Sequence, residues 1–511
     1  MIGSIAALAA AAVGLSPDAS AAPGKPNVVV IVTDDQTYRD LHQRGVMPKT
    51  RRLIGGRGVS FRRYYASNPL SCPSRTTNLT GQYSKNHKLT RNQFRNRVYC
   101  SKPKLLNYRN LLPVWLQKRG YRTLHVGRFL NAFGLGGRTR RVAPGWDYWA
   151  NPVETNVSAG ALFFGYRLNI NGRLTRKFGS RRKRKPRAYF TDVITRLALK
   201  QVRATDRSTP FYLAVDHRAP HEDLASPVGP QPAPRHGRSL RGKGLPTPPN
   251  YNEADVSDKA RWLRNSLRLS STNSSLIKRR YVRRLGSLRS VDDSVGRIVK
   301  TLRRLGELKR TYIFFASDNG FFNGEHRISK GKFRPYEEAT HVPLLVRGPG
   351  IPRGKVSRAL VANIDLVPTI VHVTGAGARR AMDGRSLLPF ARKPRKRSRR
   401  PILLESFSPE PERMRKSARR SSLLEGPSIA EIAREPSPKP WKAIVIGQWK
   451  LTRFKSQGYE LYNLKRDPFE LSSLDGSRRH RKVRRYLKRQ LKRLVRCKGK
   501  SCRRPIRVPK A

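Results

Sequence analysis

An acidic pair and a pair of an acid with a carboxamide each follow a strand that the sequence predicts to be buried. Asp34 and Asp35 come directly after 27–33, a continuous apolar run rich in β-branched residues, which is typical of a strand covered on both faces of a parallel sheet. Asp318 and Asn319 follow another apolar run of the same kind. Ligands bind at the carboxyl edge of such sheets, and oxygen donors gathered there suit Ca²⁺ or Mg²⁺ better than zinc. The alternative is that each pair only terminates its strand in a turn.

A further chemical feature is the segment 71–81, where a loop is predicted to run into a helix. Pro73 suits the first helical turn and Gly81 suits the helix end. The side chain of Ser71 then lies at the positive pole of the helix, with Arg75 one turn further along. Amide N–H groups and a guanidinium can there hold an anion, or charge that develops during a reaction. The alternative is an N-capping serine and a surface arginine.

These segments belong to a series that runs in order along the chain. Its members are D-D (34–35), S-x-P-S-R (71–75), G-Y-x-T-x-x-x-G-R (120–128), A-P-H (219–221), S-D-N-G (317–320) and G-K (331–332). The series resembles the type I sulfatases, formylglycine-dependent enzymes of the alkaline-phosphatase-like superfamily, in the serine-type variant of their motif. Residues 127–131 are similar to N-acetylglucosamine-6-sulfatase-like members. The resemblance extends from residue 27 to about residue 474.

The resemblance implies a modified nucleophile and a metal ion. Ser71 matches the residue that a formylglycine-generating maturation enzyme oxidises to formylglycine, whose hydrate attacks the substrate; Cys72 matches the variable position of the motif. A divalent cation is also implied, with Ca²⁺ expected and Mg²⁺ as the alternative. Its expected ligands are Asp34, Asp35, Asp318 and Asn319.

The resemblance also implies a cationic site for a sulfate ester. The expected catalytic residues are Ser71, Arg75, His221 and Lys332, and the expected substrate-binding residues are Arg128 and His217. The family has a lysine where this chain has Arg128. An arginine keeps the charge and can bind two sulfate oxygens, but it cannot give up a proton. The leaving alcohol is therefore expected to receive its proton from His221 or Lys332. A histidine placed like His217, just after a strand, is otherwise a structural hydrogen-bonding residue.

The fold class predicted for the chain is α/β. The resemblance implies an alkaline-phosphatase-like sandwich with a mixed, mostly parallel sheet between helices, plus a smaller C-terminal antiparallel sheet with a helix. Apolar runs and helical periodicity place its elements. Sheet strands are predicted at 27–33, 121–128, 211–215, 311–316 and 342–350, helices at 111–120, 189–203 and 280–305, small-sheet strands at 441–454 and 459–464, and a final helix at 481–496.

The predicted domain organisation has four parts: a signal peptide at 1–22, a catalytic domain at 23–390, a basic Pro/Ser-rich excursion at 391–440 and a small-sheet subdomain with a basic helix at 441–511. The leader is Ala-rich and ends in an A-x-A cleavage pattern, so the protein is expected to be secreted or periplasmic. A disordered leader from a misassigned start is the alternative. No apolar run is long enough to span a membrane. Segments 150–187 and 222–275 are predicted to be irregular surface loops.

Positive charge dominates the composition. The chain of 511 residues has 108 Lys and Arg against 33 Asp and Glu, a formal net charge of +75. Such an excess indicates a polyanionic partner, namely a sulfated polysaccharide, an anionic cell wall or nucleic acid bound non-specifically. A compositional bias of the source proteome is the alternative. Among the cysteines, Cys497 and Cys502 are predicted to close a small loop in an oxidising compartment, whereas the pairing of Cys72 and Cys100 is left open.

The function expected from these features is hydrolysis of a sulfate monoester, with a sulfated sugar preferred over other substrates. Two alternatives remain open. A phosphate or phosphonate ester hydrolase could use the same scaffold, and a catalytically silent secreted protein could simply bind polyanions.

Overall fold

The larger part of the fold is a sheet whose strands are spread along most of the chain. The computed structural model describes residues 24–92, 100, 105–134, 139–153, 163–180, 184–223, 226, 228–240, 242–407 and 438–510. The strands of the large sheet are β1 (Asn27–Thr33), β2 (Val59–Phe61), β4 (Arg122–Gly127), β5 (Tyr148–Pro152), β6 (Leu168–Ile170), β7 (Arg173–Leu174), β8 (Phe211–Asp216), β9 (Thr311–Ser317), β10 (Leu344–Arg347) and β11 (Lys355–Ser357). A separate two-stranded pair is formed by β3 (Tyr64–Tyr65) and β12 (Val361–Ala362).

The large sheet is mixed, with a parallel centre. Its ten strands follow the order β11-β2-β10-β9-β1-β8-β4-β5-β6-β7, and β9, β1, β8, β4 and β5 pair in parallel. The partners of β10 and the β5–β6–β7 edge are antiparallel. The predicted mixed, mostly parallel sheet is therefore confirmed, and the carboxyl ends of its central strands lie at one edge.

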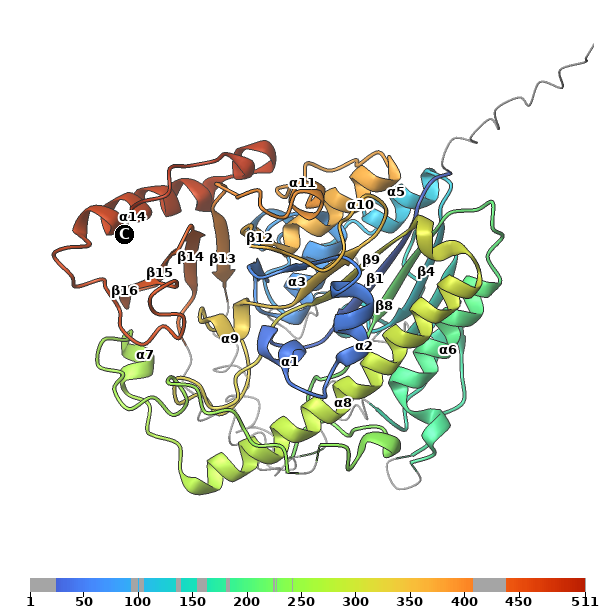
Figure 1. Ribbon diagram of the computed structural model, residues 1–511, viewed down its shortest axis with the longest axis horizontal. Helices are drawn as coiled ribbons and strands as arrows, with labels where there is room; N and C mark the ends of the chain where they lie inside the picture. Colours follow the sequence, from blue (N-terminus) through green and yellow to red (C-terminus); the bar gives the residue numbers. More distant parts are fainter. Residues whose placement is uncertain are drawn as a thin grey trace, which may run out of the picture.

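Helices cover both faces of this sheet (Figure 1). The helices and helical turns of the larger part of the fold are α1 (Tyr38–His42), α2 (Pro48–Thr50), the π-helical turn η1 (Arg51–Gly55), α3 (Ser71–Thr80), α4 (Ser84–His87), α5 (Leu112–Lys118), η4 (Pro186–Ala188), α6 (Phe190–Arg203), η5 (Pro234–His236), α8 (Ser271–Arg304), η6 (Glu307–Arg310), α9 (Glu337–Thr340), η7 (Asn363–Asp365), α10 (Leu366–Thr374) and α11 (Leu388–Arg392).

Strand β1 shows why both faces must be covered. Val30 belongs to the core on the side of α3, α5 and α10, whereas its neighbour Ile31 belongs to the core on the side of α6 and α8. Successive side chains of a strand point to opposite faces. Because residues 28–32 of β1 are all apolar, the strand requires a helix layer on each side.

The small sheet is antiparallel and carries the last long helix. Its order is β13 (Ile402–Ser406), β14 (Trp441–Ile446), β15 (Trp449–Phe454) and β16 (Gly458–Asn463). The helix α14 (Arg481–Arg496) packs on β13, β14 and β15, with Leu487, Leu491 and Leu494 buried and its cations outward. The predicted docking of this helix on the small sheet is confirmed (Figure 1). The turns α7 (Arg261–Arg264) and η8 (Gly499–Arg503) lie near this part of the fold.

Three segments predicted to be loops contribute regular elements. Strand β13 belongs to the small sheet although it lies within 391–440, so that excursion, of which 408–437 is outside the described residues, begins only after residue 406. Strands β5 to β7 extend the large sheet within 150–187. Helix α8 begins at Ser271, where Ser270 caps it by accepting from the Asn273 N–H. Most side chains of its first turns are exposed, so no apolar periodicity signalled them.

Part of the predicted surface loop 222–275 is in fact buried. Leu263 is fully buried and Trp262 packs against Tyr336 and Phe454 in the core of the small sheet. A short segment between Pro-rich stretches lacks periodicity, and only the adjoining sheet shows that its apolar residues have a partner. The loop therefore joins the two parts of the fold.

Two disulfides are present. Cys497 pairs with Cys502, which confirms the predicted small loop, and Cys72 pairs with Cys100. Cys72 therefore has no free thiol. Among the described residues, no helix combines the length and the apolar composition that a membrane span requires. The segment 1–22, predicted as a signal peptide, lies outside the described residues.

Buried carboxyl groups gather where the large and small parts meet. Glu325 and Glu470 are almost fully buried. Burial, together with the charge of Glu338, raises the pKa of Glu325 to about 7. Burial also raises the pKa of Glu470 to about 8, although Lys450 at 2.9 Å opposes the shift. The pKa of both groups is therefore above the usual value of 4.5 for a glutamate, so each binds its proton more tightly in the folded chain than in the unfolded chain.

We predict that Glu325 and Glu470 contribute stability at about pH 5 that is lost as the pH rises to about 8. At these two positions the folded state holds more protons than the unfolded state in this range, so their contribution to the free energy of unfolding falls with pH. Thermal unfolding at constant ionic strength measures this by comparison with Glu470→Gln: relative to that variant, the unchanged chain should be more stable at pH 5 than at pH 8. A difference between the two chains that stays the same at both pH values would contradict the assignment.

Candidate active site

The carboxyl ends of β1 and β9 bring the two acidic pairs together. These strands are parallel neighbours, with Thr33 beside Ser317, so the residues that follow them leave the sheet at the same point. The backbone N–H of Asp35 donates to Asp318 Oδ1 at 3.1 Å, and Asn319 Nδ2 donates to Asp35 Oδ1 at 2.6 Å. Asp35 has a φ of 73°, a conformation that is uncommon for a side chain other than glycine and recurs at functional sites.

Ser71 is the first residue of α3 and points at this acidic edge. Lys332 Nζ donates to Ser71 Oγ at 2.7 Å, and Ser71 Oγ donates to Asp34 Oδ1 at 3.4 Å. Ser71 is 1% exposed. Its hydroxyl therefore lies between a buried ammonium and a buried carboxylate, at the positive end of a helix.

The position of α3 is held from the strand ends. Ser74 Oγ donates to the Asp318 carbonyl at 2.5 Å and accepts from Asn363 Nδ2 at 3.0 Å. Gly81 ends the helix in the left-handed conformation, with a φ of 68°, as the sequence predicts. The serine and arginine of the S-x-P-S-R motif are thus fixed relative to the side chains that were predicted to bind the metal ion.

The guanidinium of Arg75 contacts three carboxylates. Its Nε donates to Asp318 Oδ2 at 3.0 Å, and its terminal nitrogens approach Asp34 Oδ2 and Asp216 Oδ1, each at 3.3 Å. A fourth contact is donated from Arg75 to the backbone carbonyl of Arg128 at 2.6 Å. Because hydrogen bonds hold Nε and one terminal nitrogen while the other faces the Asp34 carboxylate, the guanidinium is held in one orientation.

The remaining cations surround the same carboxylates. The Arg128 side chain donates to Asp34 Oδ2, and Lys332 Nζ donates to Asp35 Oδ1 as well as to Ser71. His221 Nε2 lies 3.8 Å from Asp35 Oδ2. The structure therefore brings every predicted catalytic and metal-type residue, and Arg128, into one connected cluster.

Burial and neighbouring charges shift the pKa values of the two aspartates Asp34 and Asp318 in opposite directions. Burial alone would raise the pKa of Asp34, but Arg128, His221, Arg75 and Lys332 hold it well below the usual value. Burial and the charge of Asp34 raise the pKa of Asp318, and Arg75 offsets only part of this. Burial lowers the pKa of His221 despite the neighbouring Asp35 and Asp34. Additional positive charge would therefore stabilise the ionised acids at the strand ends.

The donor set fits a hard divalent cation. Oxygen or nitrogen atoms of Asp34, Asp35 and His221 lie within 4.8 Å of one another. Asn319 Oδ1 is buried and has no hydrogen-bond partner among the described residues, so this amide oxygen has a lone pair to offer. Carboxylates with an amide oxygen are the ligands of Ca²⁺ and Mg²⁺, and the residues present therefore match the group that the sequence implies.

His217 is not brought into this cluster. Its ring is fully buried, neither ring nitrogen has a hydrogen-bond partner among the described residues, and burial lowers its pKa to about 3. Only its backbone joins the sheet, by donating to the Val32 carbonyl at 2.8 Å. A neutral imidazole enclosed in this way does not present itself to a substrate, so the substrate-binding prediction for His217 finds no support in its contacts.

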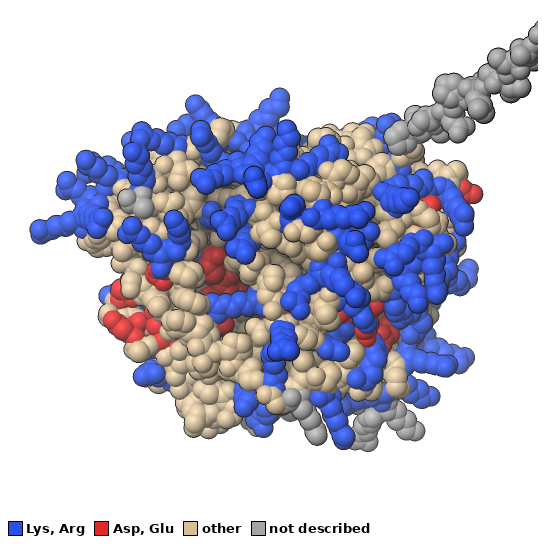
Figure 2. Space-filling model, viewed as in Figure 1, with Lys and Arg blue, Asp and Glu red and all other residues tan. Residues whose placement is uncertain are grey.

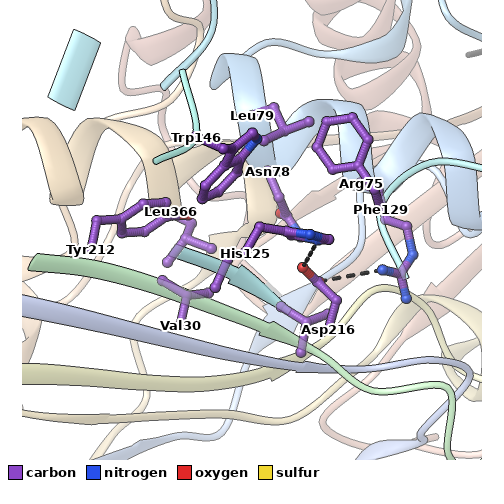
Figure 3. Close-up of a pocket in the computed structure, with 12 residues that line it drawn as sticks. Val30, Arg75, Asn78, Leu79, His125, Phe129, Trp146, Tyr212, Asp216 and Leu366 are labelled. Atoms are coloured by element: carbon purple, nitrogen blue, oxygen red, sulfur yellow. Dashed lines mark hydrogen bonds and ion pairs between the residues drawn. The ribbon is translucent and has the colours of Figure 1, made fainter. Parts of the chain in front are cut away.

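Two residues of this region were missed by sequence reasoning, namely Asp216 and His125. Asp216 ends β8 and His125 lies in β4. His125 Nε2 is 3.3 Å from Asp216 Oδ2, whereas Arg75 contacts the other oxygen of the same carboxylate, Oδ1 (Figure 3). Both face a cavity of about 30 Å³ behind Arg75, which Phe129, Trp146 and other apolar residues line. The only sequence signal is an acid at a strand end, the same signal that identified Asp34.

We predict that Asp216→Asn lowers kcat/KM by about tenfold, because the buried Arg75 loses one of the charges that hold it. The change keeps the shape of the side chain, so the folded state should persist. Steady-state kinetics on a small aryl sulfate would measure the effect. The exposed Asp206→Asn serves as control, because among the described residues the Asp206 carboxylate accepts hydrogen bonds only from Ser208. Equal kinetics for both variants would contradict a positioning role for Asp216.

Comparison with known proteins gives a consistent result. The family model described as Sulfatase matches residues 26–376. The chain is 35% identical over 376 residues to the human N-acetylglucosamine-6-sulfatase, covering 72% of this chain and 64% of that protein. It is 33% identical to an arylsulfatase of Volvox carteri, covering 96% of this chain and 77% of that one. It spans only 51% of a protein described as a putative extracellular sulfatase Sulf-1 homolog of Caenorhabditis elegans.

Solved structures share the fold. One, determined in complex with its substrate D-glucosamine-2-N,6-O-disulfate, superposes with a TM-score of 0.70 at 23% identity, covering 92% of this chain and 97% of the other. The phosphonate monoester hydrolase of Agrobacterium radiobacter superposes with a TM-score of 0.64 at 19% identity, covering 91% and 95%. At these identities the likeness extends to the architecture alone.

Proposed function

Because the chain belongs to the sulfatase family of sulfuric ester hydrolases, we propose that it hydrolyses a sulfate monoester at Ser71. The observation that carries the proposal is the contact of Ser71 Oγ with Lys332 Nζ at 2.7 Å and with Asp34 Oδ1 at 3.4 Å. A hydroxyl in this buried, charged setting at a helix N-terminus is placed for covalent chemistry on an anion.

The chain's own cations would bind the substrate sulfate. Arg75, Arg128 and Lys332 surround the position of Ser71 and would offset negative charge on the sulfate oxygens as the bond to the alcohol breaks. The alcohol would take a proton from Lys332 or His221. Arg128 would bind without transferring a proton, because a guanidinium keeps its charge.

Two groups beyond the encoded side chains complete the proposal. Formylglycine made from Ser71 by a maturation enzyme would supply, as its hydrate, a nucleophile that can later release sulfate. Ca²⁺, or alternatively Mg²⁺, would be held by Asp34, Asp35, Asp318 and Asn319 and would supply positive charge at the sulfate oxygens. The buried, unpaired Asn319 Oδ1 supports this ligand set.

A sulfated sugar is the proposed substrate class, and the proposed location is outside the cytoplasm. Similarity to N-acetylglucosamine-6-sulfatase supports the first, and similarity to proteins named as extracellular sulfatases supports the second. A phosphonate or phosphate ester is the second candidate, favoured by the shared architecture with a phosphonate monoester hydrolase.

Parallel assays with p-nitrophenyl sulfate, p-nitrophenyl phosphate and phenyl p-nitrophenyl phosphonate test the proposed reaction. We expect kcat/KM for the sulfate to exceed the others by about 100-fold or more, since differential transition-state binding sets such ratios. A preference for either phosphorus ester would instead establish the second candidate. Absence of turnover on all three by formylglycine-bearing protein would favour a silent polyanion-binding protein.

A further inference from the structure

A large basic groove lies on the face of the sheet that α6 and α8 cover, apart from the cluster around Ser71. Its volume is about 720 Å³, and α2, η1, η4, α6 and α8 contribute its walls. We call it the α6–α8 groove. Figure 2 shows Lys and Arg side chains crowded over the region where these helices lie in Figure 1.

The acids of the groove are already neutralised by its own residues. Arg235 donates a bidentate pair of hydrogen bonds to Asp192, at 2.6 and 2.9 Å, and a further hydrogen bond to Asp293 at 3.1 Å. Asp293 also accepts from Lys49 at 2.6 Å and lies 2.7 Å from His236 Nε2. No acidic charge in the lining is therefore left to pair with the remaining cations.

The remaining cations are exposed and have no acidic partner among the described residues. They are Arg52, Arg187, Arg196, Arg297, Lys300 and Arg303. Those on α8 follow helical spacing and face one side, and Thr195 Oγ1 donates to Ser294 Oγ at 2.7 Å, which holds α6 against α8. The groove thus presents unpaired positive charges from a fixed framework.

We propose that the α6–α8 groove binds a polysulfated polysaccharide chain at a site separate from the catalytic pocket. Repeated sulfate groups match a row of arginines, which bind such anions through paired N–H groups. The groove lining contains no aromatic residue, whereas single-stranded nucleic acids are held by aromatic stacking as well as charge. A sulfated chain therefore suits the groove better than single-stranded nucleic acid, and the binding test below distinguishes it from duplex DNA.

The separation of the two sites sets the length of the chain that could reach both. Arg284 of α8 donates to the Asp35 and Pro220 carbonyls beside the candidate active site, and residues 293–303 of the same helix line the groove. At 1.5 Å per residue, the groove extends from about 14 to about 28 Å along α8 from Arg284. A monosaccharide or disaccharide cannot span this distance, whereas a polysaccharide can.

Binding is tested with heparin as the probe, on the full-length chain and without any turnover. The groove variant Arg297→Gln/Lys300→Gln/Arg303→Gln is compared with Arg485→Gln/Lys492→Gln/Arg496→Gln on α14, which removes the same net charge from another exposed basic helix. We expect the groove variant to lose about tenfold or more in affinity at 0.15 M salt, and to show a shallower salt dependence because fewer counterions are released. The α14 variant should lose less than about twofold, in line with a surface charge away from the contact.

Three controls make each result decisive. Turnover of an aryl sulfate by both variants should equal that of the unchanged protein, which separates this inference from the proposed function at Ser71. Equal loss of heparin affinity in both variants would show diffuse charge attraction and overturn the proposal. Duplex and single-stranded DNA are the competing ligands. If either binds as tightly as heparin and its affinity falls by the same factor in the groove variant, the assignment to a sulfated polysaccharide is overturned.

Discussion

Replacing Ser71 by alanine is expected to lower sulfate ester hydrolysis by about 10⁴-fold or more, because the proposed nucleophile is removed while the surrounding charges remain. Among the described residues, Ser71 Oγ forms hydrogen bonds only with Lys332 and Asp34, so the variant should keep its fold. Its circular dichroism and unfolding midpoint should stay close to those of the unchanged chain. The measurement is kcat/KM on p-nitrophenyl sulfate.

A separate measurement identifies the chemical form of residue 71. Mass spectrometry of the peptide containing Ser71 should show the loss of two hydrogens in active protein. The variant Ser71→Cys is the matched control, because it converts the motif to the cysteine-type form and should regain activity when produced with a cysteine-type maturation enzyme. Full activity from protein whose Ser71 is entirely unmodified would overturn the formylglycine proposal while leaving the site assignment intact.

The second large effect is expected at Asp318, which joins three parts of the site. Its carboxylate accepts from Arg75 Nε and from the backbone N–H groups of Asp35 and Asn319. We expect Asp318→Asn to lower kcat by about 10³-fold, because the variant loses a charge needed to hold the cation and to orient Arg75. Metal content measured by mass spectrometry should fall in parallel.

A binding readout keeps this prediction separate from catalysis. After chelation, Ca²⁺ should raise the unfolding midpoint of the unchanged protein and leave that of Asp318→Asn nearly unchanged, since a ligand that binds only the folded state stabilises it. Mg²⁺ in the same titration distinguishes the two candidate ions. The exposed Asp206→Asn is the control and should respond like the unchanged protein. Identical metal content and activity in Asp318→Asn would refute the ligand assignment.

The sequence carried most of the information about the central sheet and the candidate site. The run 28–32 is apolar at every position, which leaves a doubly covered strand as the stable arrangement. Parallel strands then bring Asp35 and Asp318 to one edge, and the helix signals at Pro73 and Gly81 place Ser71 at an N-terminus. Local patterns suffice here because each residue's position follows from the element that ends or begins beside it.

The groove and the surroundings of Arg75 were decided only by the tertiary structure. Asp216 lies 141 positions from Arg75 in the chain and approaches it through strand pairing. No local pattern separates this acid from the adjacent His217, whose ring nitrogens form no hydrogen bond with any described residue of the site. The α6–α8 groove likewise combines cations from segments around residues 52, 190 and 300. In a chain with a net charge of +75, the sequence position of a lysine or arginine does not indicate whether its charge is paired in the folded structure. Which charges remain unpaired depends on the acids that packing places beside them.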